Sequence, residues 1–254
     1  MPFPPPPRSR GPREGPPPCR PAKNGLKVGE FAVRSERMGT GPVFFRAIHV
    51  EVPGKAVYRR LGYREGMTEL SSGQRDGLER AIAEGAALVE LQGSALAIPV
   101  ASHGKHGVTL ATGDVLKSEK LSKLLEGASE VLFMGATAGR SVVEEIARDT
   151  SAGDLSRAVV LDAVASEMTD KALDWIVEYV GGMLRREGKE LSSRRFSAGY
   201  GDFGLEHQRL MHARLKLSEL GVELTPSCVL VPEKSVTAIA GIRWQLCQCS
   251  QRSA

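Results

Sequence analysis

The residues best suited to chemistry gather in one segment, which reads Arg195-Phe196-Ser197-Ala198-Gly199-Tyr200-Gly201-Asp202. The planar guanidinium of Arg195 can hold a carboxylate through two parallel hydrogen bonds. Gly199 and Gly201 let the backbone approach a ligand closely and adopt dihedral angles closed to other residues, so Tyr200 is presented on a bent backbone. The segment predicts a recognition loop for a small zwitterionic ligand. A plain loop held by an arginine ion pair is the alternative.

A second glycine-containing segment, residues 135–141, follows a strand-like run and precedes a helix, as a phosphate-binding loop does. Three residues rather than four separate its glycines, and Arg140 stands where such a loop has lysine. We therefore interpret it as a tight strand-to-helix turn. His103 and His106 have no third ligand nearby in the sequence and are interpreted as exposed loop histidines.

The cysteines indicate neither a disulfide framework nor a metal site. They are Cys19, Cys228, Cys247 and Cys249, and the one-residue gap of Cys247-Gln248-Cys249 is not the two-residue gap typical of zinc and cluster sites. No nucleophile, base and orienting acid can be assembled from the rest of the chain. We predict no metal ligand and no catalytic residue, and a reducing, cytoplasmic environment.

Hydrophobic periodicity outlines the elements that must position the Arg195 segment. Strand-like patterns cover residues 48–52, 95–100, 108–111, 131–134, 228–231 and 235–242, and helical patterns cover 53–61, 72–91, 117–125, 155–184 and 205–220. Thr169 and Asp170 could cap a second helix inside 155–184, which leaves one long helix or two collinear ones open. The pattern predicts an α+β fold, with helices packed on a twisted, largely antiparallel sheet.

Composition divides the chain into one domain and two tails. Residues 1–42 are rich in proline and arginine and are predicted to be a disordered tail, residues 43–246 a single domain, and residues 247–254 a C-terminal tail. Residues 1–46 hold nine Lys or Arg and three Glu, so the net charge of +4 leaves −2 for the remainder. A slightly acidic domain argues against nucleic-acid binding. No apolar run reaches the length of a signal peptide or a membrane span.

Three ordered segments resemble the activation (reactivation) domain of vitamin B12-dependent methionine synthase, in a stand-alone form. In that family the S-adenosylmethionine loop reads Arg-x-x-x-Gly-Tyr, which Arg195, Gly199 and Tyr200 match. Weaker similarity covers residues 57–63 and 133–139. The segments that carry the resemblance are Arg195 to Asp202, Leu224-Thr225-Pro226-Ser227-Cys228 and Val231-Pro232-Glu233-Lys234-Ser235-Val236-Thr237-Ala238-Ile239.

The resemblance implies reductive reactivation of a cobalamin-dependent methionine synthase, with S-adenosylmethionine as the methyl donor to reduced cobalamin. Arg195 would hold the ligand carboxylate, Tyr200 would face the corrinoid, and Glu190 is the candidate for an acidic residue that precedes the arginine in the family. The backbone that would line the adenosyl group comprises Phe196, Ser197, Ala198, Gly199 and Tyr200. Reduced cobalt and a sulfonium need alignment rather than a general base, which agrees with the missing catalytic residues.

The cobalamin would arrive on another polypeptide, because none of the five histidines lies in the Asp-x-His-x-x-Gly pattern of corrinoid domains. The implied partners are a cobalamin-binding methionine synthase subunit and a flavodoxin or ferredoxin-like electron donor. Two alternatives stay open. The chain could reactivate another corrinoid methyltransferase, or it could be a non-catalytic module that caps a corrinoid protein.

Overall fold

The computed structural model describes residues 41–64 and 66–245. Within them, seven strands form one sheet in which every pairing is antiparallel, in the order β4-β3-β2-β5-β9-β6, with β1 pairing on β2. The strands are β1 (Val43–Phe45), β2 (Gln92–Gly104), β3 (Gly107–Leu110), β4 (Val115–Lys117), β5 (Glu130–Thr137), β6 (Lys189–Leu191) and β9 (Ser235–Trp244). The predicted α+β class and antiparallel sheet are confirmed.

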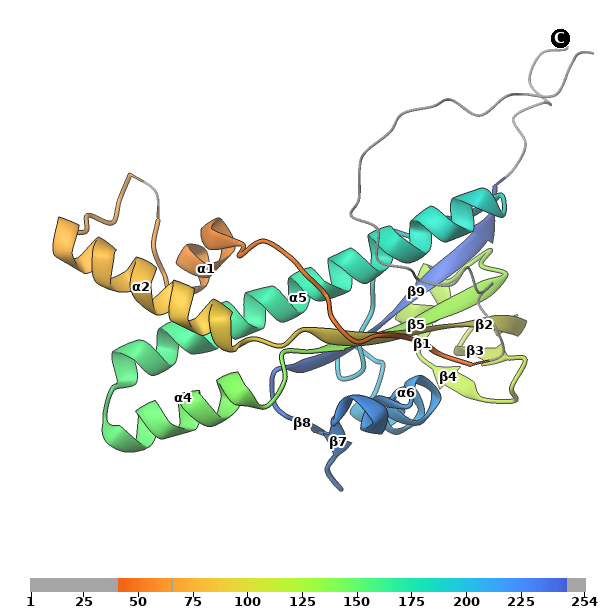
Figure 1. Ribbon diagram of the computed structural model, residues 1–254. Helices are drawn as coiled ribbons and strands as arrows, with labels where there is room; N and C mark the ends of the chain where they lie inside the picture. Colours follow the sequence, from red (N-terminus) through yellow and green to blue (C-terminus); the bar gives the residue numbers. More distant parts are fainter. Residues whose placement is uncertain (1–40, 65, 246–254) are drawn as a thin grey trace, which may run out of the picture. The chain divides into compact units, whose positions relative to one another are not determined.

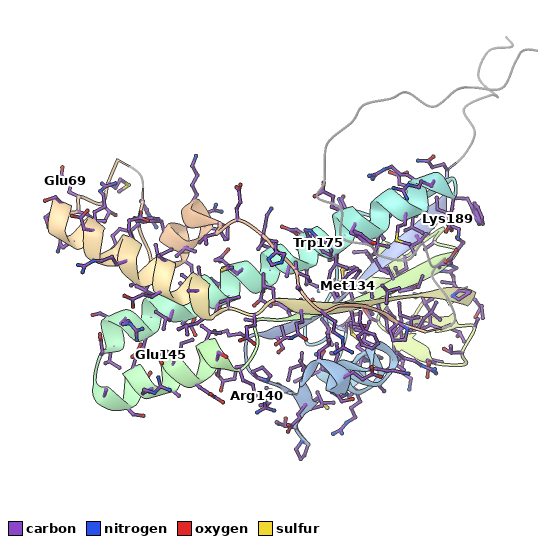
Figure 2. All side chains as sticks on the ribbon, viewed as in Figure 1. Glu69, Met134, Arg140, Glu145, Trp175 and Lys189 are labelled. Carbon is purple, nitrogen blue, oxygen red and sulfur yellow. The ribbon has the colours of Figure 1, made fainter. Side chains whose placement is uncertain are left out.

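Side chains of the central strands alternate between two hydrophobic cores, as the period of two in a strand requires. On β5, Leu132 and Met134 enter the first core, whereas Val131 and Phe133 enter the second. Nearly every residue of β5 is therefore buried, and Figure 2 shows Met134 in the middle of the sheet. The sheet is covered on both faces.

Four helices contribute apolar side chains to the first core: α1 (Gly54–Arg60), α2 (Ser72–Leu88), α4 (Ser141–Ala152) and α5 (Leu155–Arg186). α5 packs directly on the sheet, whereas α1, α2 and α4 pack mainly on α5. Figure 1 shows α5 running along the sheet, with α2 and α4 beside its first half. α5 continues through Thr169, whose hydroxyl donates to the Ala165 carbonyl oxygen at 2.7 Å instead of capping a new helix. Residues 155–186 therefore form one long helix rather than two collinear ones.

The second face is covered by α3 (Glu119–Leu124), α6 (Gln208–Leu215) and the connections around them. Figure 1 shows α6 on the side of the sheet opposite to α5. The predicted helix over residues 205–220 is wrong in its continuity. It comprises a 3-10 turn (Leu205–His207), α6 and a second 3-10 turn (Leu217–Leu220), because Lys216 adopts a left-handed conformation with φ of 49°.

Further boundaries differ from the prediction. Residues 47–52 form no strand; the backbone N–H of Ile48 donates to the Leu91 carbonyl oxygen, and its side chain is buried in the first core. In the 228–231 segment only Leu230–Val231 is a strand (β8), which pairs with β7 (Glu223–Leu224). Most of the two predicted tails, with Cys19, Cys247 and Cys249, lies outside the described residues.

No helix in the described part of the chain is long and apolar enough to cross a membrane.

Candidate functional site

The site forms where the edge of β9 loses its neighbour. β6 pairs with β9 only from Lys189 opposite Trp244 to Leu191 opposite Ile242. Further along, Phe196 and Ile239 exchange two backbone hydrogen bonds of 2.9 and 2.8 Å. Beyond this bridge, no strand of the described residues pairs with Ser235–Thr237 on the side away from β5.

The unpaired edge points its backbone polar groups outward. Alternate residues of a strand direct their N–H and C=O groups to the same side. The backbone groups of Ile239 form hydrogen bonds with Phe196, and the Gly241 carbonyl oxygen accepts from the Ser192 N–H, on the side away from β5. The groups of Thr237 therefore face this side as well, where a cleft lies instead of a strand.

The cleft has a volume of about 490 Å³, within the range typical of small-molecule sites. Its walls come from α5, from the segment after β6, from the start of α6, and from β8 and β9. The lining residues are Asp170, Leu173, Arg195, Phe196, Ser197, Ala198, Tyr200, Leu205, Gln208, Cys228, Val229, Leu230, Glu233, Ser235, Val236, Thr237 and Ala238. Five of the seven predicted binding residues thus line one cleft; Gly199 lies in the same loop.

Arg195 is the cation of the cleft. Its Nη2 lies 2.9 Å from the Asp174 carboxylate oxygen on α5, and its side chain is 28% exposed. Its Nη1 is buried and has no hydrogen-bond partner among the described residues. A buried guanidinium donor without a partner is costly, so the group gains if a rotation brings that edge to an acceptor in the cleft.

Carboxylates outnumber Arg195 around the cleft. Asp170 and Glu233 line the cleft, and Asp174 lies one helical turn after Asp170 on α5. Burial, with a smaller contribution from the nearby Glu167 carboxylate, raises the pKa of Asp170. Arg195 therefore does not neutralise the site, which can accept a ligand that carries more than one positive charge.

The floor of the cleft holds a buried polar pair. The Thr237 hydroxyl donates to the Gln208 side-chain oxygen at 2.9 Å, and both residues are buried. Because the amide oxygen is used, the amide N–H₂ group of Gln208 is the end left for a ligand. Gln208 is not predicted by any motif in the sequence, although its spacing with Met211 and Leu215 places it on the buried face of α6.

The loop from Ser197 to Phe203 is a closed turn. Gly199 and Gly201 have φ of 87° and 62°, in the left-handed region that glycine alone adopts at no cost, as predicted from the sequence. The Gly199 N–H donates to the Phe203 carbonyl oxygen at 2.8 Å. This turn presents Tyr200, which is 68% exposed at the mouth of the cleft.

Glu190 does not lie with the other predicted site residues. It is exposed on β6, opposite Arg243 of β9, and is not among the residues that line the cleft. Its partner Arg243 lies four residues along β9 from Ile239, the partner of Phe196, so Glu190 lies on the far side of this bridge from the cleft. Asp170 of α5 and Glu233 supply the acidic groups at the cleft instead, while Asp174 of α5 pairs with Arg195.

The remaining motifs are structural. Residues 138–140 connect β5 to α4, with Gly139 at φ of 82°, so this segment is a strand-to-helix turn as predicted. His103 contacts the Ala128 carbonyl oxygen, and His106 contacts Glu119 at 2.7 Å. Among the described residues no three His, Cys, Asp or Glu side chains are grouped so that they could hold a metal ion.

Comparison with known proteins shows the fold. A crystal structure of the MetH reactivation domain bound to AdoHcy is similar to this chain with a TM-score of 0.57 and 12% sequence identity. The similarity covers 79% of this chain and 78% of that one, and it therefore includes most of the described elements. No protein-family model and no curated protein matches the chain.

Proposed function

We propose that this protein binds S-adenosylmethionine in the cleft and takes part in the reductive reactivation of a cobalamin-dependent methionine synthase. The observation that carries the proposal is the convergence on one cleft of Arg195, the loop residues Ser197, Ala198 and Tyr200, and the free edge of β9. The fold likeness to a domain crystallised with AdoHcy, the demethylated counterpart of S-adenosylmethionine, supports the choice of ligand.

The charges of the cleft suit this ligand. S-adenosylmethionine carries one carboxylate, one ammonium and one sulfonium. Arg195 takes the carboxylate in a charge-assisted hydrogen bond, which also gives its unpartnered Nη1 an acceptor once the group rotates. Asp170 and Glu233 face the two positive groups, and the Gln208 amide offers a donor to an acceptor on the adenosyl part.

The mouth of the cleft suits a protein partner. Tyr200, Leu205 and Val229 are large apolar side chains that stay exposed, and all three line the same opening. A rim of this kind is typical of surfaces that another molecule covers. In our proposal it meets the protein that carries the corrinoid, with Tyr200 toward the cofactor.

The methyl acceptor, a reduced corrinoid held by the partner, supplies the nucleophile. This chain has only to hold the sulfonium in line and keep water away. The cleft accordingly needs no general base. A flavodoxin or ferredoxin-like electron donor and a cytoplasmic location belong to the same proposal.

Titration calorimetry with S-adenosylmethionine tests the ligand. We expect wild-type protein to bind, and Arg195→Ala to weaken binding about tenfold or more, since a hydrogen bond between charged groups contributes about 1.5–3 kcal/mol. Arg194→Ala is the matched control, because Arg194 is the adjacent arginine, is exposed and does not line the cleft. A well-folded wild-type protein that shows no binding would sink the proposal.

A second candidate function is a non-catalytic module that caps a corrinoid protein, and the exposed rim of Tyr200, Leu205 and Val229 favours it. Spectroscopy of reduced cobalamin with S-adenosylmethionine separates the two. Faster methylation in the presence of this protein supports reactivation, whereas an unchanged rate with complex formation supports the module. Co-purification identifies the client, either a methionine synthase or another corrinoid methyltransferase.

A further inference from the structure

The loop that faces the cleft has a second side, which contacts the protein elsewhere. Phe196, Ser197, Ala198 and Tyr200 line the cleft, whereas Asp202 and Phe203 do not. The local bonds of the turn, such as Phe203 N–H to the Tyr200 carbonyl oxygen at 3.0 Å, define its shape. They do not fix where the turn lies on the molecule. Its position depends on contacts outside the loop.

Asp202 makes most of those contacts. One carboxylate oxygen accepts from the Ser118 hydroxyl at 2.6 Å. The other accepts from the backbone N–H groups of Glu119 and Lys120 at 2.7 and 3.3 Å. These donors lie at the corner between β4 and α3, more than 80 residues earlier in the chain. The Ser118 hydrogen bond, followed by the two backbone bonds, lowers the pKa of Asp202, so the carboxylate is the form that is held.

A second contact joins the loop to the same corner. Phe203 is 1% exposed, and its ring lies 4.3 Å from the ring of His207. His207 in turn accepts from the backbone N–H of Lys117 through Nε2 at 3.1 Å. The side chain of Lys120 also passes close to Gly201, where an added Cβ atom would lie 3.0 Å from Cδ of Lys120 and would have to displace it.

We infer that Asp202 is the positioning residue of the cleft loop: its carboxylate holds the 197–203 turn against the β4–α3 corner and so sets where Tyr200 and the ligand-facing backbone lie. The inference rests on the proposed function for the identity of the ligand, but the clamp itself does not depend on it. Asp202 touches no ligand; it acts through the loop.

Three variants test the clamp. Asp202→Ala removes every acceptor, and Asp202→Asn keeps one oxygen and adds a donor that cannot replace the other. Ser118→Ala removes one partner of Asp202, together with the N-cap bond from the Leu121 N–H of α3. Asp76→Ala on α2 is the control, because Asp76 is exposed and its side chain makes no contact with the loop. Hydrogen exchange reports the order of the loop, and calorimetry with S-adenosylmethionine reports its effect on binding.

We expect Asp202→Ala to speed exchange in the peptide that contains the Gly199 and Phe203 amides, while the amides of β5 stay protected, and to weaken S-adenosylmethionine binding about tenfold or more. Asp202→Asn and Ser118→Ala should show smaller changes in the same direction, and Asp76→Ala none.

Unchanged exchange of the loop in Asp202→Ala would overturn the clamp. So would a loosened loop with undiminished affinity. If the loop loosens but the wild-type protein does not bind S-adenosylmethionine, the clamp stands and the proposed ligand is wrong. If Asp202→Ala does not fold, the Asn and Ser118 variants carry the test.

Discussion

At the scale of residues, the cleft combines the Arg195 cation with two acidic side chains of α5 that play different parts. Arg195 is held by Asp174, so a ligand carboxylate must share or replace that contact. The side chain of Asp170 is 58% exposed, yet its pKa is raised, mainly by partial desolvation of the carboxylate. A carboxyl group kept in a place that disfavours its charge is typical of functional sites.

Replacing Asp170 should separate stability from binding. The pKa of Asp170 is higher in the folded protein than in the unfolded chain. Its contribution to stability is therefore greatest below the ordinary pKa of aspartate and is lost as the pH rises through the folded pKa, so at pH 7 the ionised group opposes folding. We expect Asp170→Asn to raise the melting temperature at pH 7 and to weaken S-adenosylmethionine binding. The gain in melting temperature should shrink as the pH is lowered. A variant less stable at pH 7, or one with unchanged affinity, would contradict this assignment.

The residues of the site were unequally predictable. Arg195, Gly199 and Tyr200 could be identified because their chemistry and spacing lie within one short segment. Asp170 and Gln208 could not, because each is an ordinary helical residue until the fold brings its helix beside β9. Glu190 is close to Arg195 in the sequence, yet its pairing opposite Arg243 places it away from the cleft.

At the scale of elements, close packing of α5 on the sheet depends on small residues in the strands. A Cβ atom added at Gly93 of β2 would lie 2.7 Å from Cδ1 of Ile176 on α5 and 2.9 Å from the Gly135 carbonyl oxygen on β5. Neither gap admits a methyl group without movement. The layer spacing between α5 and β2 is thus set at this point.

Two glycine substitutions should therefore act in opposite directions. We expect Gly93→Ala to lower the free energy of unfolding by about 1–3 kcal/mol through overpacking. Gly77→Ala, inside α2 with nothing within 4 Å of the added atom, should raise it by about 0.5–1 kcal/mol. Urea unfolding measures both.

Adding Ile176→Val to Gly93→Ala should recover part of the loss, since it removes the closest atom. If the two glycine substitutions changed the free energy of unfolding equally, packing at Gly93 would not be tight.

Hydrophobic periodicity predicts the helices and strands in which a single period, helical or strand-like, persists along the segment. The long helix α5 and strands β2, β5 and β9 were predicted, because their apolar residues repeat at the helical or strand period over many residues. The broken 205–220 segment was not, because a left-handed Lys216 carries no sequence signal comparable to glycine.

At the scale of the whole molecule, the cleft and the ionic contacts between helices are far apart. Arg157, near the start of α5, contacts Glu84 of α2 and both Glu145 and Asp149 of α4, at 2.6–3.0 Å. Asp170 lies 13 residues further along α5, which is about 20 Å at 1.5 Å per residue. The cluster joins three helices without touching the site.

Loss of Arg157 should change stability and acid resistance but not ligand affinity. The hydrogen bond from Arg157 is the main cause of the lowered pKa of Glu145. A carboxyl group whose pKa is lowered by folding stabilises the protein at pH values above the ordinary pKa of glutamate. This stabilisation is lost as the pH falls through the folded pKa. We expect Arg157→Gln to lower the melting temperature at pH 7 and to weaken the dependence of stability on pH below about pH 4.5.

Melting curves from pH 7 to pH 3 and calorimetry with S-adenosylmethionine measure the two effects. Affinity should match wild type. An affinity that fell together with stability would mean that the cluster and the cleft are coupled.

By itself, the sequence determined the class of fold and the one segment able to recognise a ligand, because periodicity, turn glycines and the Arg195 to Asp202 motif are all local properties. Only the tertiary structure decided what surrounds that segment. The free edge of β9, the carboxylates of α5, the Gln208 amide and the Asp202 clamp join residues that are tens of residues apart. Such contacts depend on how helices and strands pack, which no local pattern encodes.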